Sequence, residues 1–280
     1  MRILTLLLLG LAASFACGQT VPAPVADDAP PTATGVNEVQ RMEQEVQRVA
    51  ADVQRLKQRL PDWAAISWYA EDDVRVMQRN DAKPRVVFLG DSITHNWGGE
   101  KVSSYFHHDH DKFIPINRGI GGQNVPQMLI RMRPDVIALK PAAMVIFAGT
   151  NDLATFKVPD LLGFIEGNFV SIFELAQANK IPVVVCSILP VNDVYQKRTE
   201  ARPPNQILQL NGWLKDQAKQ RGYEYVDFYN AVSDGKDRLR AEITKDGLHP
   251  TAEGYVLMEP LVEKAIEKTL ASDSHSASSK

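Results

Sequence analysis

Cysteine is scarce in this chain of 280 residues, which contains only Cys17 and Cys186. Cys186 ends the apolar run Val183–Cys186, whose composition is typical of a strand interior, so we expect it to be a small buried hydrophobe. Two cysteines placed in this way exclude a disulfide framework. The fold must therefore be held together by its hydrophobic core.

Long hydrophobic runs and a strong net charge are also absent. The N-terminal apolar run, Ile3–Ala13, has eleven residues, fewer than the roughly 20 that a helix needs to cross a bilayer. The formal net charge of −3 gives no electrostatic reason to expect a nucleic-acid partner. No internal repeat is visible. Composition alone therefore favours an ordinary globular protein.

The N-terminus has the features of an export signal over residues 1–17: a basic Arg2, the apolar run and small residues around Ala16. Ser14–Cys17 resembles a bacterial lipobox but lacks the leucine that usually stands three residues before the cysteine. Two outcomes stay open, a lipid anchor on Cys17 or ordinary cleavage and release. In either case we expect a periplasmic or extracellular protein.

A heptad pattern follows a predicted disordered linker at residues 18–36. Apolar residues recur every seven positions in two series between residues 37 and 60, namely Val39, Val46, Val53 and Leu60, and Met42, Val49 and Leu56. This spacing predicts a helix that either forms a short coiled coil, and so a homo-oligomer or a spacer, or lies as an amphipathic helix on the following domain. A polar, Ser-rich tail at residues 272–280 is predicted to be disordered.

Strands and helices alternate through the domain predicted at residues 61–271. The expected strands are Arg85–Leu89, Ile114–Asn117, Ala143–Ala148, Ile181–Ile188 and Tyr223–Phe228. The expected helices are Val125–Leu139 with an interruption at Pro134, Leu161–Asn179, Pro204–Arg221 and Ala252–Leu270. Such alternation predicts an α/β fold with a mostly parallel five-stranded sheet and helices on both faces.

Four polar blocks stand at strand ends or in loops. They are Gly90-Asp91-Ser92, the run from Asn117 to Asn124, Gly149-Thr150-Asn151-Asp152, and the run from Asp246 to Pro250. The first three follow strands, and the carboxyl ends of parallel strands meet at one edge of a sheet. We therefore expect these blocks to face a common crevice.

The residue types in these blocks suit acyl transfer. Ser92 is a candidate nucleophile, which needs a base within hydrogen-bond reach. His249 can be that base, and Asp246, three residues earlier, can fix its tautomer. The backbone N–H of Ser92, a glycine N–H from the second block and the Asn151 side-chain amide are candidate oxyanion donors.

Together these blocks resemble the SGNH (GDSL) hydrolase family, with Ser92, Gly122, Asn151 and the Asp246–His249 pair matching its motifs in order. The Gly-Ile-Gly-Gly run is similar to that of platelet-activating-factor acetylhydrolase subunits, and lysophospholipase L1-like members are also similar. The resemblance implies a flavodoxin-like three-layer α/β/α sandwich with strand order 2-1-3-4-5. It also implies catalysis without a metal or a cofactor.

Some assignments within the blocks are less secure. Gly119 and Gly121 are alternatives to Gly122 as the oxyanion donor. Thr94 stands where a G-x-S-x-G motif would have its second glycine, which argues against an α/β-hydrolase fold. Asp91 and Asp152 are expected to bond nearby backbone N–H groups, as carboxylates in turns commonly do.

Other polar and aromatic residues have simpler explanations. A serine after a strand is commonly only a helix N-cap, which is the alternative for Ser92. The run His107–Asp111 suggests zinc, but adjacent residues cannot all face one ion, so a solvated loop is expected. Arg118 could contact a substrate carboxylate or phosphate, but a surface salt bridge is the favoured interpretation. Trp97 and Tyr195 could wall a pocket or pack against the domain.

The sequence thus predicts an exported serine ester hydrolase that acts through an acyl-enzyme on Ser92. Its expected substrates are short-acyl, especially acetyl, esters such as acetylated carbohydrates. A lipid acylhydrolase similar to a lysophospholipase or thioesterase is the alternative among enzymes. A non-catalytic envelope tether, in which the helix at residues 37–60 is the functional part, is the alternative from another class.

Overall fold

The computed structural model describes residues 33–99, 102–107 and 110–278, and it divides the chain into units at residues 1–56 and 57–280. The predicted signal peptide and residues 18–32 of the predicted linker lie outside the described residues. Helix α2 (Ala33–Arg59) begins before residue 37, so residues 33–36 of the predicted linker are helical instead. No glycine or proline interrupts the chain between Asn37 and Arg59, so a helix can propagate through it.

The heptad positions of α2 that the structure describes are exposed. Met42, Val46, Val49 and Val53 are 69%, 67%, 52% and 44% exposed. Such a row of apolar side chains is typical of a surface that binds a partner. Among the described helices, none is both long enough and apolar enough to cross a bilayer.

The second unit begins at Lys57 with the last residues of α2, continues through a short 3-10 helix (Leu60–Asp62) and turns to residue 69, and then alternates helices and strands. Its strands are β1 (Arg85–Gly90), β2 (Ile114–Gly119), β3 (Ala143–Phe147), β4 (Val183–Cys186) and β5 (Glu224–Val226). Its α-helices are α3 (Ala70–Gln78), α4 (Ser92–Trp97), α5 (Val125–Arg131), α6 (Thr150–Thr155), α7 (Leu161–Ala178), α8 (Pro204–Arg221), α9 (Phe228–Val232) and α10 (Ala252–Ser278).

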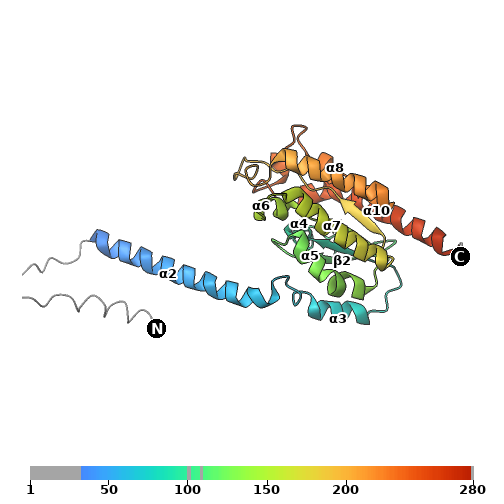
Figure 1. The fold of residues 1–280 in the computed structure, drawn as a ribbon, viewed down its shortest axis with the longest axis horizontal. Helices are drawn as coiled ribbons and strands as arrows, with labels where there is room; N and C mark the ends of the chain where they lie inside the picture. The colour runs from blue at the N-terminus through green and yellow to red at the C-terminus, as the bar shows by residue number, and fades with distance from the viewer. Residues whose placement is uncertain (1–32, 100–101, 108–109, 279–280) are drawn as a thin grey trace, which may run out of the picture. The chain divides into compact units, whose positions relative to one another are not determined.

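The five strands form one parallel sheet in the order β2-β1-β3-β4-β5, as expected (Figure 1). Because β1 is parallel to its neighbours β2 and β3, the loops that follow these three strands lie at the same edge of the sheet. In register, Gly90 at the end of β1 pairs with Gly119 of β2 and with Phe147 of β3. This pairing brings the first three polar blocks to neighbouring positions.

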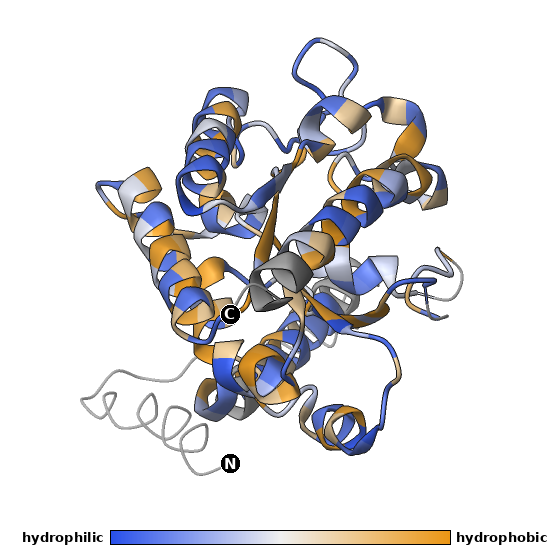
Figure 2. Cartoon of the chain, turned by 90° about the vertical axis from the view of Figure 1, so that its right-hand side faces the viewer, coloured by the Kyte–Doolittle hydropathy of each residue, from blue (hydrophilic) through white to orange (hydrophobic). Residues whose placement is uncertain are grey.

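Alternate residues of the strands pack into two separate hydrophobic cores, one on each face of the sheet. Val87 and Leu89 belong to a core that α5, α7 and α8 cover, whereas Val86 and Phe88 belong to a core that α4, α9 and α10 cover. This alternation follows from the period of two in a strand, and burial on both faces explains the unbroken apolar run in β1. Figure 2 shows the strands largely in the colour of hydrophobic residues, with helices of mixed colour around them.

The C-terminus differs from the prediction. α10 continues to Ser278, so the segment 272–278 of the predicted disordered tail is helical. The segment contains neither glycine nor proline, and adding a residue to an existing helix needs no new nucleus. A polar, Ser-rich composition was therefore insufficient evidence for disorder in this segment.

Candidate active site

Ser92 is the first residue of α4, directly after the turn that leaves β1. Gly90 is required in this turn, because a Cβ atom there would collide with the Thr94 side chain and lie 2.8 Å from the Phe147 carbonyl oxygen. The N-cap of α4 is Asp91, whose Oδ1 accepts a hydrogen bond from the Ile93 N–H at 2.9 Å. The alternative in which Ser92 is itself the cap is therefore wrong, and its hydroxyl is available for chemistry.

The structure brings Ser92, His249 and Asp246 together from opposite ends of the domain. Ser92 Oγ lies 2.9 Å from His249 Nε2, and His249 Nδ1 lies 2.7 Å from Asp246 Oδ2. Because an ionised carboxylate can only accept, the proton of a neutral imidazole belongs on Nδ1. Nε2 is then an acceptor that faces the serine hydroxyl, which is the arrangement of a nucleophile and its base.

A tight loop before α10 holds Asp246 in its ionised form. Oδ1 accepts hydrogen bonds from the N–H groups of Leu248 and His249 at 2.9 and 2.8 Å. Partial burial opposes ionisation, but these bonds and the one from the His249 ring outweigh it and lower the pKa of Asp246 to about 2. Gly247 has a φ of +78° and no room for a Cβ atom against the Asn192 carbonyl oxygen, so this turn requires glycine.

The glycines of the second block separate into two kinds. Gly119 donates its N–H to Asn117 Oδ1 at 2.8 Å, and a Cβ atom there would collide with the backbone of α4. It is therefore a packing glycine. Gly121 and Gly122 lie beyond the strand, and a Cβ atom on Gly121 would lie 4.0 Å from Ser92 Cβ. The loop that contains the predicted Gly122 thus passes beside Ser92.

Asn151 reaches the same region from the first turn of α6. Its Nδ2 donates to the Gln123 carbonyl oxygen at 3.0 Å, which ties the third block to the second. On its other side, Asn151 Oδ1 accepts from Arg202 Nη2 at 3.3 Å. All five predicted site residues therefore belong to one cluster at the carboxyl edge of the sheet.

Open hollows border this cluster on both sides. One, of about 530 Å³, is lined by Gly121 and Gly122 together with Trp63 and Trp68. Another, of about 610 Å³, is lined by Asp246, His249 and Tyr195. A third, of about 660 Å³, shares Trp68, His95 and Asn96 with the first hollow and Val102 and Pro250 with the second. The three hollows therefore adjoin one another, and we refer to them together as the groove beside the Gly122 loop and His249.

Comparison with known proteins identifies the family. The model of the GDSL-like lipase/acylhydrolase family matches residues 88–257, which is more than half of the chain. This chain belongs to the GDSL-like lipase/acylhydrolase family. It is accordingly an SGNH-type esterase with an α/β fold, as the motif resemblance predicted.

Solved structures agree with this assignment. A candidate acylhydrolase from Bacteroides fragilis is 39% identical, covering 74% of this chain and 98% of its own, with a TM-score of 0.64. A GDSL-like lipase from Bacteroides thetaiotaomicron is 38% identical, covering 73% and 98%, with a TM-score of 0.62. An acetyl-xylooligosaccharide esterase from Geobacillus, 20% identical over 67% and 94% at a TM-score of 0.51, shows a shared fold. The curated proteins gave no significant match.

Two buried aspartates beside the GDSL-family site act on the backbone, as predicted. Asp91 caps α4, and the Asp152 carboxylate accepts from the Val125 N–H at 3.0 and 3.2 Å. Burial raises the pKa of Asp91 to about 7 against the opposing effect of the Ile93 N–H. Burial likewise raises the pKa of Asp152 to about 7 against the effect of the Val125 N–H.

The His107–Asp111 run is not simply a solvated loop. His107 is exposed, but His110 is buried, stacks on Phe113 and lies 3.2 Å from Glu263 Oε1 of α10. Among the residues that the structure describes, no three His, Cys, Asp or Glu side chains gather as metal ligands would. His110 thus belongs to the core, and its aromatic neighbours explain why a polar motif is buried.

One other prediction requires correction, and one open alternative is resolved. Arg118 is buried rather than on the surface, with its guanidinium 2.8 Å from both Asp72 and Asp73 and against the Tyr69 ring. Its ion pairs compensate its desolvation. Trp97 is a core residue that donates to Glu259 at 3.0 Å, whereas Tyr195 does line the groove beside His249.

The sequence did not reveal two arginines at the site. Arg198 donates to the carbonyl oxygen and to Oδ2 of Asp246 at 3.0 and 3.1 Å, and Arg202 donates to Asn151. Both come from the irregular connection between β4 and α8, which has no periodicity and no motif. The signal that could have drawn attention to them is the presence of two arginines in a connection leaving the carboxyl end of a strand.

The raised pKa values predict how stability depends on pH. Between pH 4 and 7 the folded state keeps protons on Asp91 and Asp152 that the unfolded state has lost, so the free energy of unfolding should fall as pH rises through this window. Asp152→Asn, whose amide oxygen can still accept from Val125, should reduce this slope. Urea denaturation at pH 5 and pH 7.5 measures it.

A matched control is Asp234→Asn on the surface. The pKa of Asp234 is lowered, chiefly by the backbone N–H of Lys236, so this residue is ionised in both states above pH 5 and its replacement should leave the slope unchanged. Equal slopes for wild type and Asp152→Asn would contradict the proposed protonation of Asp152.

Proposed function

We propose that this GDSL-family hydrolase cleaves carboxylic esters through an acyl-enzyme on Ser92. The observation that supports this most directly is the continuous hydrogen-bond chain from Ser92 Oγ to His249 and on to Asp246, at 2.9 and 2.7 Å. A serine hydroxyl is a weak nucleophile alone, and this chain supplies the base and orients it.

The proposed reaction has two stages. Ser92 Oγ attacks the ester carbonyl carbon while its proton moves to His249 Nε2, and the bond to the alcohol then breaks as His249 gives the proton to the leaving oxygen. Water next attacks the acyl-enzyme, loses a proton to His249 and releases the acid and free Ser92. Asp246 stays ionised and stabilises the imidazolium in both stages.

The negative oxygen of each tetrahedral intermediate needs donors that are already in place. We propose that the N–H groups of Ser92 and Gly122 and the Asn151 amide supply them. The proximity of the Gly121–Gly122 loop to Ser92 and the bond from Asn151 to Gln123 support this assignment. Gly119 is excluded because its N–H already bonds Asn117.

Replacing the nucleophile tests the mechanism. Ser92→Ala or His249→Ala should lower kcat for p-nitrophenyl acetate by about 10³-fold or more, because each removes part of one catalytic unit. Ser171→Ala, on the exposed face of α7, is the control and should keep wild-type activity.

The same samples should be treated with a fluorophosphonate probe, with the adduct located by mass spectrometry. Wild type should be labelled on Ser92 and the Ser92→Ala variant should not. Full turnover in Ser92→Ala would rule out the mechanism, and a wild-type chain without an adduct would favour the non-catalytic tether.

For the substrate, we propose a short acyl group, acetyl above all, on a carbohydrate. The groove beside the Gly122 loop carries hydrogen-bonding side chains such as Asn96 and Gln127 beside two exposed indoles, Trp63 and Trp68. Flat apolar faces with a polar rim suit a sugar ring better than an alkyl chain. A structural neighbour is an acetyl-xylooligosaccharide esterase, which supports this choice through the fold.

A substrate series tests this proposal. kcat/KM should be highest for acetyl esters, should fall for acyl chains of eight carbons and more, and should rise for acetylated xylo-oligosaccharides over acetylated monosaccharides. Trp63→Ala and Trp68→Ala should each raise KM for the oligosaccharide by about 10-fold, the effect of roughly 1.4 kcal/mol, with little change for p-nitrophenyl acetate.

Ile130→Ala is the matched control, since Ile130 is an exposed apolar residue of α5 that lies outside the three hollows. A preference for long acyl chains would instead support the lipid acylhydrolase similar to a lysophospholipase or thioesterase. Unchanged KM values in both tryptophan variants would contradict a role for these indoles.

We also propose that the chain is exported, by a lipid anchor on Cys17 or by release, and that α2 is a homo-oligomerising or spacing helix. The exposed heptad side chains Met42, Val46, Val49 and Val53 support a partner for α2, and a second copy of this chain offers the same spacing.

Expression of the full chain in a Gram-negative host tests both ideas. The mass of the mature protein should show cleavage before or near Cys17.

Sedimentation of the same protein should give a multiple of the monomer mass. The double variant Val46→Glu with Val53→Glu should reduce the sedimenting mass to that of the monomer, because charges at core heptad positions prevent association. The control Gln47→Glu changes a residue outside both heptad series. An uncleaved chain, or a monomeric wild type, would contradict the respective proposal.

A further inference from the structure

Arg202 is a buried cation that contacts Asn151, one of the proposed oxyanion donors. Arg202 precedes α8 in the chain, and its side chain contacts the start of α6. Its Nε donates to the carbonyl oxygen and to Oγ1 of Thr150 at 3.0 and 3.1 Å. Its Nη2 donates to Asn151 Oδ1 at 3.3 Å. Arg202 therefore contacts the side chain of Asn151, which is predicted to bind the oxyanion, and also contacts Thr150, the residue before it.

The hydrogen-bond partners of Arg202 are neutral. Only 8% of the residue is exposed, and no carboxylate of the described chain lies within ion-pair distance of it. Burial lowers the pKa of Arg202, and the more distant charges of Asp91 and Asp246 oppose this effect. The groups that Arg202 contacts directly belong to Thr150 and Asn151, so its direct contacts lie on the proposed oxyanion side of the site.

The contact fixes the orientation of the Asn151 amide. A guanidinium can only donate, so the atom that faces Arg202 must be Oδ1 and Nδ2 must face the second block. One N–H of Nδ2 bonds the Gln123 carbonyl oxygen at 3.0 Å, which leaves the other N–H for a substrate. A cation on the amide oxygen also draws electron density from Nδ2 and strengthens it as a donor.

We propose that Arg202 is a positioning residue for oxyanion stabilisation, which it serves by orienting and polarising the Asn151 amide. This inference rests on the acyl-enzyme function proposed above. It assigns different tasks to the two arginines of one connection, because Arg198 contacts Asp246 and Arg202 contacts Asn151. The two tasks are separable by experiment.

A double-mutant cycle between Arg202 and Asn151 tests the inference. Arg202→Met should lower kcat for p-nitrophenyl acetate by about 10- to 100-fold with KM changed less than about threefold, because the effect belongs to the transition state. In an Asn151→Ala background the same change should cost less than about threefold. Arg202→Lys, which keeps a charged donor, should recover part of the loss.

Arg198→Met is the matched control from the same connection. The effect of Arg198→Met should add to that of Asn151→Ala. This variant should also change the pH dependence of kcat/KM, because Arg198 contacts Asp246, which orients His249. Arg202→Met should change that pH dependence less than Arg198→Met does, because only Arg198 contacts Asp246 directly. Circular dichroism and stoichiometric fluorophosphonate labelling check folding, and the cycle is run with Arg202→Lys if Arg202→Met does not fold.

Two failures are distinguishable. Additive effects of Arg202 and Asn151, measured on activity that still requires Ser92, would overturn the role of Arg202 alone. Activity that survives Ser92→Ala would overturn the acyl-enzyme mechanism itself.

Discussion

The hydrogen bond between Ser92 and His249 depends on how firmly α4 and α10 are joined. These helices lie far apart in sequence, yet Tyr255 of α10 donates to the Ile93 carbonyl oxygen at 2.7 Å and its ring stacks on Trp97. Trp97 in turn donates to Glu259 of α10 at 3.0 Å. Because these contacts fix α4, which begins at Ser92, against α10, which begins three residues after His249, they hold the proposed nucleophile near the proposed base.

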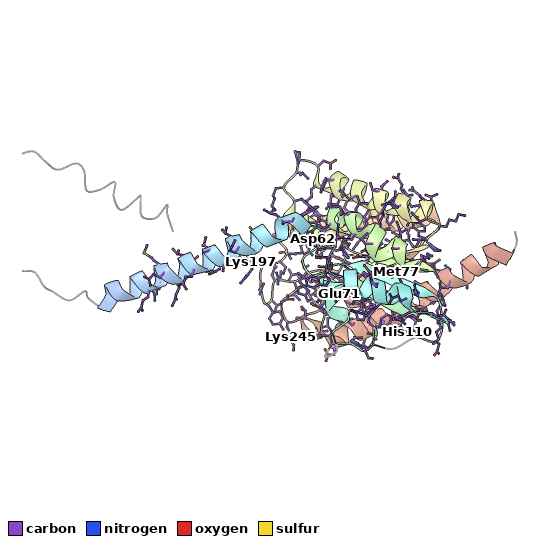
Figure 3. All side chains as sticks on the ribbon, turned by 90° about the horizontal axis from the view of Figure 1, so that it is seen from below. Asp62, Glu71, Met77, His110, Lys197 and Lys245 are labelled. Atoms are coloured by element: carbon purple, nitrogen blue, oxygen red, sulfur yellow. The ribbon has the colours of Figure 1, made fainter. Side chains whose placement is uncertain are left out.

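A second set of contacts holds the opposite side of the site. Gln123 donates to the Ala64 carbonyl oxygen in the turns before α3, accepts from Arg131 of α5 and accepts from Asn151 through its own carbonyl. The connection between β4 and α8 lies toward the same end of the domain as these turns, as the labels of Lys197 and Asp62 in Figure 3 indicate. Segments without regular structure are thus held by specific polar contacts.

The alternation of strands and helices made the parallel sheet predictable, and the placement of the polar blocks made the grouping of Ser92 and Asn151 predictable, because these features depend on local periodicity and on the geometry of parallel strands. The strand order and the grouping with Asp246 and His249 followed from the resemblance to a known family and from the chemistry of the blocks. Arg198 and Arg202 were not predictable, because long side chains in an irregular connection can point anywhere. The burial of Arg118 and His110 was missed for a related reason, since their partners come from α3 and α10.

The separate roles of Asp91, which caps a helix, and Ser92, which bonds His249, have a practical consequence. Asp91 supplies the cap of α4, and the hydroxyl of Ser92 bonds only to His249 among the described residues. The nucleophile can therefore be removed without taking a support from the helix that carries it. An inactive chain of this kind would retain the shape of its groove, which makes it a suitable trap for capturing intact ester ligands from a mixture of esters.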